Sequence, residues 1–341
     1  MLVEPGYGSE LAQVFPSIAS FVQVLVAQIT CCREQRNRYD RLIGADCNKR
    51  NNSGEAIVMA RSPVQSSFDA VPMKFAIAVA ADAIWTDGRH GALASRDLLL
   101  ETASSGQMAA IELRAHDGGS FEGWPDVDVA TFIFFYVIEG EVSFEMDDGH
   151  RVTMGRREAV HLPFLRHVVR THYSDDFRAA EVRSPGSASP SDLVPLLQVP
   201  EAGENGNWEE QIVRNRAELF IRGDGPRAFF TYRDLGTAGV TERRIHIHDG
   251  DGAKQPMAGG TGWHNHSMSQ LFFVLEGAAT LSVEGHGTHH MVPGDVMIIG
   301  KRMSHNVSSY SEGYNVFEVC LPADYDTLDQ PAPAAMAEVV N

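Results

Sequence analysis

The chain has 341 residues, more than a single hydrophobic core usually supports, so we expect two domains. Hydrophobic residues make up 43% of the sequence and charged residues 21%, proportions that exclude a disordered or fibrous protein. Acidic residues (45) outnumber basic ones (28), and the net charge of −17 disfavours nucleic acid and anionic membranes as partners. The four cysteines are too few for a disulfide scaffold, which favours a reducing, cytoplasmic location.

The first 58 residues differ in composition from the rest. Residues 15–30 are apolar, but this stretch is too short for a membrane span and contains a proline and two glutamines. No basic residue precedes Arg33, so the start of a secretory signal is missing. Two interpretations stay open. Residues 1–58 are either a weakly ordered leader or an addition ahead of a true start at Met59.

From residue 73 onward, short apolar runs with period-2 alternation predict β-sandwiches or barrels. The run FYVIEG at 135–140 recurs as FFVLEG at 272–277, an offset of 137 residues. Gly155 aligns with Gly294 at an offset of 139. A repeat of this length is a whole domain rather than a solenoid unit. We therefore predict an N-terminal barrel over 59–190, a linker over 191–210 and a C-terminal barrel over 211–341.

Histidines are concentrated in the second repeat, where eight of the 14 lie between residues 246 and 305. His264, His266 and Gln270 are separated by even numbers of residues, so on a β-strand they point to one face. An antiparallel neighbour would bring His305 opposite them. Three imidazoles on a divalent metal leave coordination positions open, as in a reactive site. The sequence predicts a metal centre of these histidines, with Gln270 either a fourth ligand or a hydrogen-bond partner.

The histidine pattern resembles the cupin superfamily. His264, His266 and Gln270 fit its first motif, H-x-H followed by an acidic residue, with glutamine in place of the usual glutamate. Gly294 and His305 fit part of its second motif, which departs at the expected proline, second glycine and asparagine. The resemblance covers roughly residues 70–341. It implies an all-β fold of two tandem double-stranded β-helix (jelly-roll) barrels and, by analogy, a homodimer.

The first repeat does not keep the candidate ligands. Their positions are occupied by Val127, Val129 and Ile133 at the offset of 137, and by Arg166 at the offset of 139. Aliphatic side chains do not bind metals, and an arginine carries a permanent positive charge. The N-terminal barrel is therefore expected to lack a metal.

The neutral ligand set has an electrostatic consequence. A divalent ion held by three histidines and an amide keeps its full charge, which favours enolates, phenolates and carboxylates. We expect a small-molecule substrate and choose His246 as the candidate general base. The expected substrate pocket is lined by Arg244, Trp263, Phe272, Ile299 and Phe317.

Three functional hypotheses follow. The first is a metal-dependent oxidoreductase, an Fe(II) dioxygenase acting on a small enol, phenol or hydroxyaromatic acid. The second is a redox-free Zn, Mn or Ni isomerase, lyase or cyclase. The third is a barrel that binds a small molecule without turnover. The sequence contains no nucleophile elbow, phosphate loop or dinucleotide fingerprint that would favour another chemistry.

Overall fold

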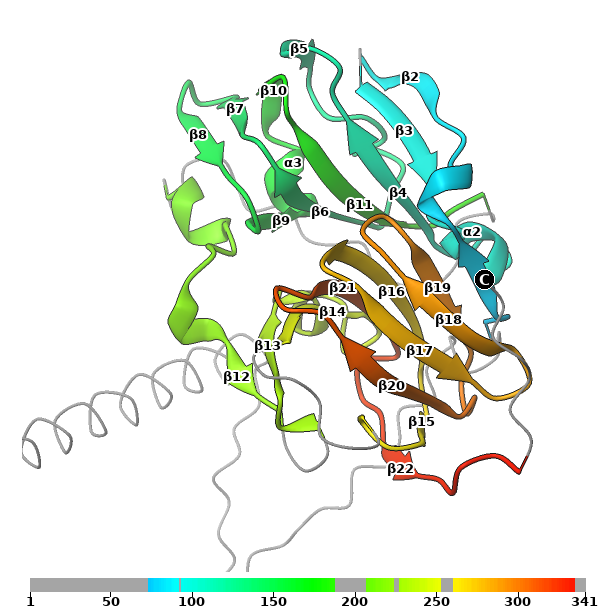
Figure 1. Cartoon of the computed structure of the whole chain (residues 1–341). Helices are drawn as coiled ribbons and strands as arrows, with labels where there is room; N and C mark the ends of the chain where they lie inside the picture. Colours follow the sequence, from blue (N-terminus) through cyan, green and yellow to red (C-terminus); the bar gives the residue numbers. More distant parts are fainter. Residues whose placement is uncertain (1–72, 92, 188–206, 224–226, 253–259, 335–341) are drawn as a thin grey trace, which may run out of the picture. The chain divides into compact units, whose positions relative to one another are not determined.

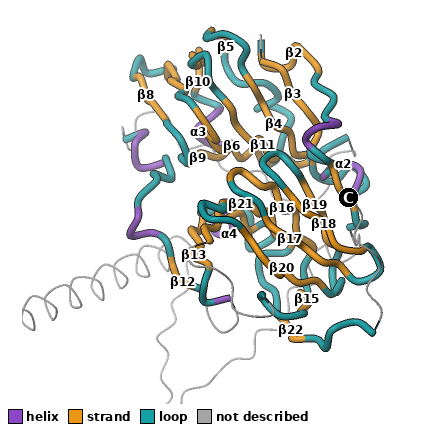
Figure 2. Tube along the Cα trace, in the orientation of Figure 1, coloured by secondary structure: helices purple, strands orange, loops and turns teal. Residues whose placement is uncertain are grey.

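The computed structural model describes residues 73–91, 93–187, 207–223, 227–252 and 260–334. Strands dominate these residues and the helices among them are short (Figure 2). The predicted leader over 1–58, the alternative start Met59 and most of the predicted linker lie outside the described residues. None of the helices described is long and apolar enough to cross a bilayer.

The strands of the N-terminal barrel form two sheets (Figure 1). The larger sheet has the order β2 (Thr86–His90), β3 (Leu93–Asp97), β4 (Ala109–Arg114), β11 (Arg178–Ser184), β6 (Phe132–Glu139) and β9 (Ala159–His161). The smaller sheet has the order β5 (Gly119–Glu122), β10 (Val168–Tyr173), β7 (Val142–Met146) and β8 (Arg151–Met154). Short helices occur at η2 (Ala80–Asp82), α2 (Leu100–Ala103) and α3 (Leu162–Leu165).

The C-terminal barrel also has two sheets. The larger has the order β1 (Ala76–Ala78), β19 (Val296–Ile299), β16 (Ser269–Glu276), β21 (Asn315–Leu321), β14 (His246–Gly252), β13 (Phe230–Asp234) and β12 (Ile221–Arg222). The smaller has the order β18 (Gly287–Met291), β17 (Ala279–Val283), β20 (His305–Tyr310), β15 (His264–His266) and β22 (Thr327–Asp329). Short helices occur at η3 (Trp208–Gln211), η4 (Ala217–Leu219) and α4 (Thr237–Val240).

The two barrels repeat one strand order. The series β3-β4-β11-β6-β9 matches β13-β14-β21-β16-β19, and β5-β10-β7-β8 matches β15-β20-β17-β18. The predicted all-β class with two tandem barrels is therefore confirmed.

In the structure, equivalent residues of the two barrels remain 137 positions apart around Gly294. The sequence alignment had assigned an offset of 139 there. Arg157 N donates to Val137 O in one barrel, and Gly294 N donates to Val274 O in the other. The alignment of Gly155 with Gly294 is therefore wrong, because hydrogen bonding equates Gly294 with Arg157. An aligned glycine is a weak guide here, since both turn residues adopt a positive φ whatever their side chain.

The corrected offset changes which residue of the N-terminal barrel is equivalent to His305. Strands β10 and β20 begin at Val168 and His305, which stand 137 residues apart. The residue equivalent to His305 is therefore Val168 rather than Arg166. Valine does not bind a metal either, so the consequence for the N-terminal barrel is unchanged.

Strand pairing crosses the predicted domain boundaries at two places. β1, which precedes the N-terminal barrel strands in the chain, pairs antiparallel with β19 of the C-terminal barrel. Val213, beyond the predicted linker, forms a bridge with Ala159 on β9 of the N-terminal barrel. Each barrel therefore pairs with a short segment from the other half of the chain. These pairings connect the two barrels.

Side chains on the larger C-terminal sheet alternate between two environments. Leu271 and Phe273 on β16 belong to the apolar cluster that contains the N-terminal barrel core, whereas Phe272 belongs to the cluster inside the C-terminal barrel. On β21, Phe317 packs against Tyr136 with ring centroids 5.1 Å apart. The neighbouring Glu318 lines the interior cavity. One face of the sheet thus forms the contact between barrels, and the other forms the site.

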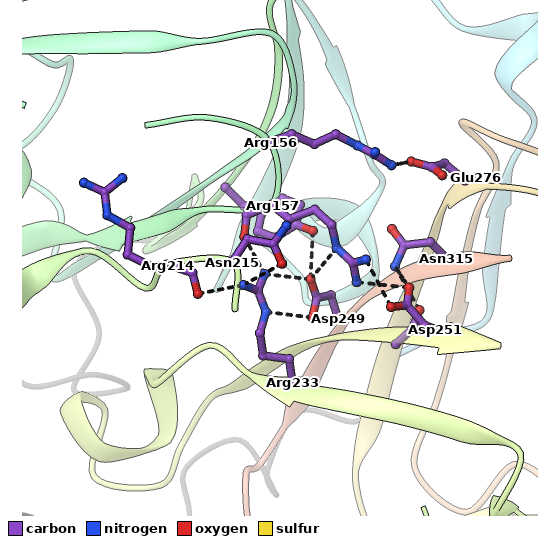
Figure 3. Close-up of polar contacts among 11 residues, drawn as sticks. Arg156, Arg157, Arg214, Asn215, Arg233, Asp249, Asp251, Glu276 and Asn315 are labelled. Carbon is purple, nitrogen blue, oxygen red and sulfur yellow. Dashed lines mark hydrogen bonds and ion pairs between the residues drawn. The ribbon is translucent and has the colours of Figure 1, made fainter. Parts of the chain in front are cut away.

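Buried arginine–carboxylate pairs connect the barrels in a repeated manner. Arg96 Nε donates to Glu112 Oε2 at 2.6 Å, and its Nη2 donates to Gly294 O in the other barrel. The equivalent Arg233 is 0% exposed, donates to Asp249 Oδ2 at 2.8 Å and reaches the carbonyl oxygen of Arg157 (Figure 3). Each arginine therefore binds a carboxylate in its own barrel and the equivalent turn in the other.

Candidate metal centre

His264, His266 and His305 converge inside the C-terminal barrel. β15 and β20 are antiparallel neighbours, and His264 lies directly opposite His305. All three side chains are buried, and one ligand nitrogen of each lies within 4.8 Å of the other two. The His264 and His305 rings have centroids 4.4 Å apart. Strand parity and antiparallel pairing thus bring together the three histidines of the predicted centre.

Hydrogen bonds orient the three rings toward a common point. Nδ1 of His264 lies 2.8 Å from Gly262 O, and Nδ1 of His305 lies 3.0 Å from Met303 O. Because a carbonyl oxygen only accepts, both Nδ1 atoms carry the proton and both Nε2 atoms present a lone pair. Nδ1 of His266 lies 2.8 Å from Thr327 Oγ1, which anchors the third ring.

The three imidazoles are neutral at physiological pH. Burial lowers the pKa of each, and for His305 burial and the neighbouring His264 lower the pKa to about 3. Unprotonated imidazole is the form that binds a metal, so the cluster needs no proton release to accept one. Its donor set fits one divalent transition metal ion.

Gln270 lies on β16 and lines the same cavity. Its Nε2 donates to Glu318 Oε2 at 3.4 Å, and an ionised carboxylate accepts only. The contact directs the amide NH2 group of Gln270 toward Glu318. Direct ligation by Gln270 stays a prediction.

The three histidines open onto a cavity of about 700 Å³, a size typical of small-molecule sites. Of the residues proposed from sequence, the cavity is lined by His246, His264, His266, Gln270, Phe272 and His305. Four others are not among its lining residues. Phe317 lies on the opposite face of its strand, Ile299 lies in the barrel core, Trp263 is half-buried beside the site, and Arg244 contacts Glu242.

The cavity is also lined by a buried acid–base pair, His248 and Glu318, which the sequence analysis did not select as functional. His248 Nε2 lies 3.2 Å from Glu318 Oε2, and both side chains are buried. Burial acts to lower the pKa of His248, but the Glu318 charge outweighs it and holds this pKa well above its usual value. His248 shares strand parity with His246, a signal the sequence contained. Glu318 stood out only as a marker of the repeat.

His246, the candidate general base, lies beside this pair. Its ring centroid is 4.9 Å from that of His248, and its Nε2 is 3.6 Å from Asp234 Oδ1. Burial and the nearby His248 lower the pKa of His246 to about 4, so it is neutral at physiological pH and able to accept a proton. Its role as a base stays a prediction.

In the N-terminal barrel, the position equivalent to Glu318 is enclosed by aromatic rings. Glu181 accepts hydrogen bonds from Trp124 Nε1 and contacts His90 Nε2, each at 3.0 Å. Trp124 packs edge-on against Phe135 with ring centroids 4.6 Å apart. Within the described parts of the chain, two groups of side chains are arranged so that they could hold an ion, and both lie in the C-terminal barrel: His264, His266 and His305, and His248, Glu318 and Cys320.

Comparison with known proteins gives one family match. Residues 254–319 match the family described as the cupin domain. The comparison with curated proteins found no match.

Similar solved structures include oxalate decarboxylases. The Lactobacillus farciminis oxalate decarboxylase formate complex is 12% identical, with 74% of this chain and 88% of that chain covered and a TM-score of 0.47. A mutant of the Bacillus subtilis oxalate decarboxylase is 16% identical, with 74% and 78% covered and a TM-score of 0.46. A second mutant of that enzyme is 15% identical, with 82% and 89% covered and a TM-score of 0.46.

Proposed function

We propose that this chain, a two-barrel member of the cupin superfamily, is a metal-dependent, redox-neutral enzyme, a lyase or isomerase acting on a small enolisable anion. A single observation carries the proposal. The buried His248–Glu318 pair lines the same cavity as the three-histidine cluster. Proton transfer next to a polarised oxygen is the step that such reactions require.

The protein's own residues divide the chemistry between them. His264, His266 and His305 would hold the ion, which would supply charge that polarises a carbonyl, enol or carboxylate oxygen of the substrate. His248, kept protonated by Glu318, is placed to deliver a proton to the substrate carbon or oxygen. Neutral His246, which lies on the same strand and lines the cavity, is the candidate to remove one. Phe272 and neighbouring apolar side chains exclude water from the reacting atoms.

The Fe(II) dioxygenase hypothesis is separated from this proposal by its need for oxygen. Protein loaded with Mn(II), Zn(II) or Fe(II) is incubated with keto acids, β-diketones and hydroxyaromatic acids, under argon and in air. NMR in D2O follows carbon–hydrogen exchange and product, and an electrode follows oxygen. We expect exchange or product under argon with a redox-inert metal. Turnover only with Fe(II) and with oxygen uptake supports the dioxygenase instead, and binding without turnover supports a non-catalytic barrel.

Glu318→Gln tests the acid–base pair directly. The substitution removes the charge that keeps His248 protonated, so we expect kcat to fall by about 10²- to 10⁴-fold. Metal content should stay near that of the unaltered protein, because Glu318 is not one of the three histidine ligands. Glu312→Gln, at an exposed turn, is the matched control and should leave both quantities unchanged. Full activity in the Glu318 variant would rule out the proposed role.

A further inference from the structure

Arg227 is a cation at the cavity wall that forms no ion pair with the described residues. It is half-buried in the segment between β12 and β13 and lines the cavity together with the three histidines. Its Nη1 atom is buried and has no hydrogen-bond partner among the described residues. On the adjacent strand, Arg233 is bound by Asp249 and by backbone carbonyls. Because an unpaired buried donor costs free energy, such a group is typical of a site whose partner arrives with the ligand.

Arg227 lies in the same cavity as the candidate metal centre. The lining of this cavity includes Arg227 together with His264, His266 and His305. Glu318, the buried carboxylate lining the cavity, is engaged by His248 at 3.2 Å and by Gln270 at 3.4 Å. The wall that carries Arg227 is therefore electropositive and suited to an anion.

The rest of the cavity wall is largely apolar. Phe230, Phe272, Val307 and Val316 line it and belong to the core cluster of the C-terminal barrel. A cavity of about 700 Å³ has room for an apolar body in addition to a carboxylate.

We propose that Arg227 binds the carboxylate of the substrate, while a keto or hydroxyl oxygen of the same molecule faces the three-histidine centre. The substrate class is then keto or hydroxy acids that carry an aryl or alkyl body. A guanidinium presents two parallel donors that match a carboxylate, which fixes orientation as well as charge. The contact with the metal centre rests on the proposed function. The carboxylate contact at Arg227 does not, so the two can fail separately.

The test measures ligand binding by the full chain. Calorimetry with the Zn(II)-loaded protein compares phenylacetate with phenylacetamide, which has the same ring but no charge. We expect phenylacetate to bind more tightly, and Arg227→Gln to raise its Kd by about 10- to 100-fold while leaving that of the amide unchanged. Arg216→Gln, an exposed arginine outside the cavity, is the control and should change neither Kd. Because Arg227 Nη1 has no partner to lose, its variant should unfold at an unchanged or higher temperature.

A second experiment distinguishes the effect of Arg227 on ligand binding from the effect of the metal. In His305→Ala, which lacks one ligand, the preference for phenylacetate should persist and should still disappear when Arg227→Gln is added. A preference lost in His305→Ala but kept in Arg227→Gln would overturn the inference, as would the absence of phenylacetate binding. If Arg227 controls the preference but no acid is turned over, the inference holds and the proposed function fails. If the Arg227 variant turns over acids as well as the unaltered protein does, the proposed function holds and the inference about Arg227 fails.

Discussion

Replacing His305 by alanine is expected to abolish both metal binding and activity. His305 supplies one of three converging nitrogens, and its ring lies 4.4 Å from that of His264. Loss of an outer hydrogen-bond partner of a metal ligand already costs about 10- to 100-fold in affinity, so loss of a ligand should cost more. Metal content after dialysis, measured by elemental analysis, checks the prediction. Turnover of any substrate found for the unaltered protein should fall with it.

The control for this variant is His290→Ala, an exposed histidine on β18. It should keep full metal content and activity. Thermal unfolding of both variants shows whether the barrel still folds. A correctly folded His305→Ala protein that keeps one tightly bound ion would contradict the assignment of this ligand.

Asp249→Asn is expected to destabilise the chain by about 3–5 kcal/mol, because it leaves a fully buried arginine without its counter-charge. Asp249 is 0% exposed and accepts hydrogen bonds from Arg233, Arg157 and Tyr136. Arg157 and Tyr136 come from the N-terminal barrel, so the loss should loosen the contact between barrels as well. A lower thermal unfolding temperature and a lower denaturant midpoint measure the effect.

Glu276→Gln is the matched control for the buried network. Glu276 pairs with Arg156 in the same region (Figure 3), but the two side chains are 47% and 52% exposed. Solvent screens such a pair, so its removal should cost no more than about 1 kcal/mol. Equal losses from Asp249→Asn and Glu276→Gln would show that burial of the network contributes nothing.

The sequence predicted the fold through its repeat, because both barrels keep the same apolar runs at the same spacing. It did not predict that β1 pairs with β19, since a three-residue strand carries no signal for its partner. It also shifted the register after Gly155, where Arg157 adopts the positive φ that Gly294 adopts in the other barrel.

The metal centre could be predicted because even numbers of residues separate His264, His266 and Gln270. A β-strand places side chains with this spacing on one face. The pocket walls could not, because parity alone does not say which face of a strand points inward. Phe317 and Glu318 are neighbours, and the apolar side chain was chosen for the pocket. In the fold, the N-terminal barrel covers the face that carries Phe317, and Glu318 points to the cavity. The sequence did not point to Arg227, because its proposed role depends on how its side chain lies among the described residues of the folded chain.

The metal centre can be tested by an anomalous difference map from crystals of the protein, recorded at the absorption edge of the metal found by elemental analysis. We expect one strong peak within about 2.0–2.2 Å of a nitrogen of His264, His266 and His305 alike. A crystal grown with Mn(II), Fe(II) or Zn(II) that shows no peak at this point, or shows its peak at another cluster, would contradict it.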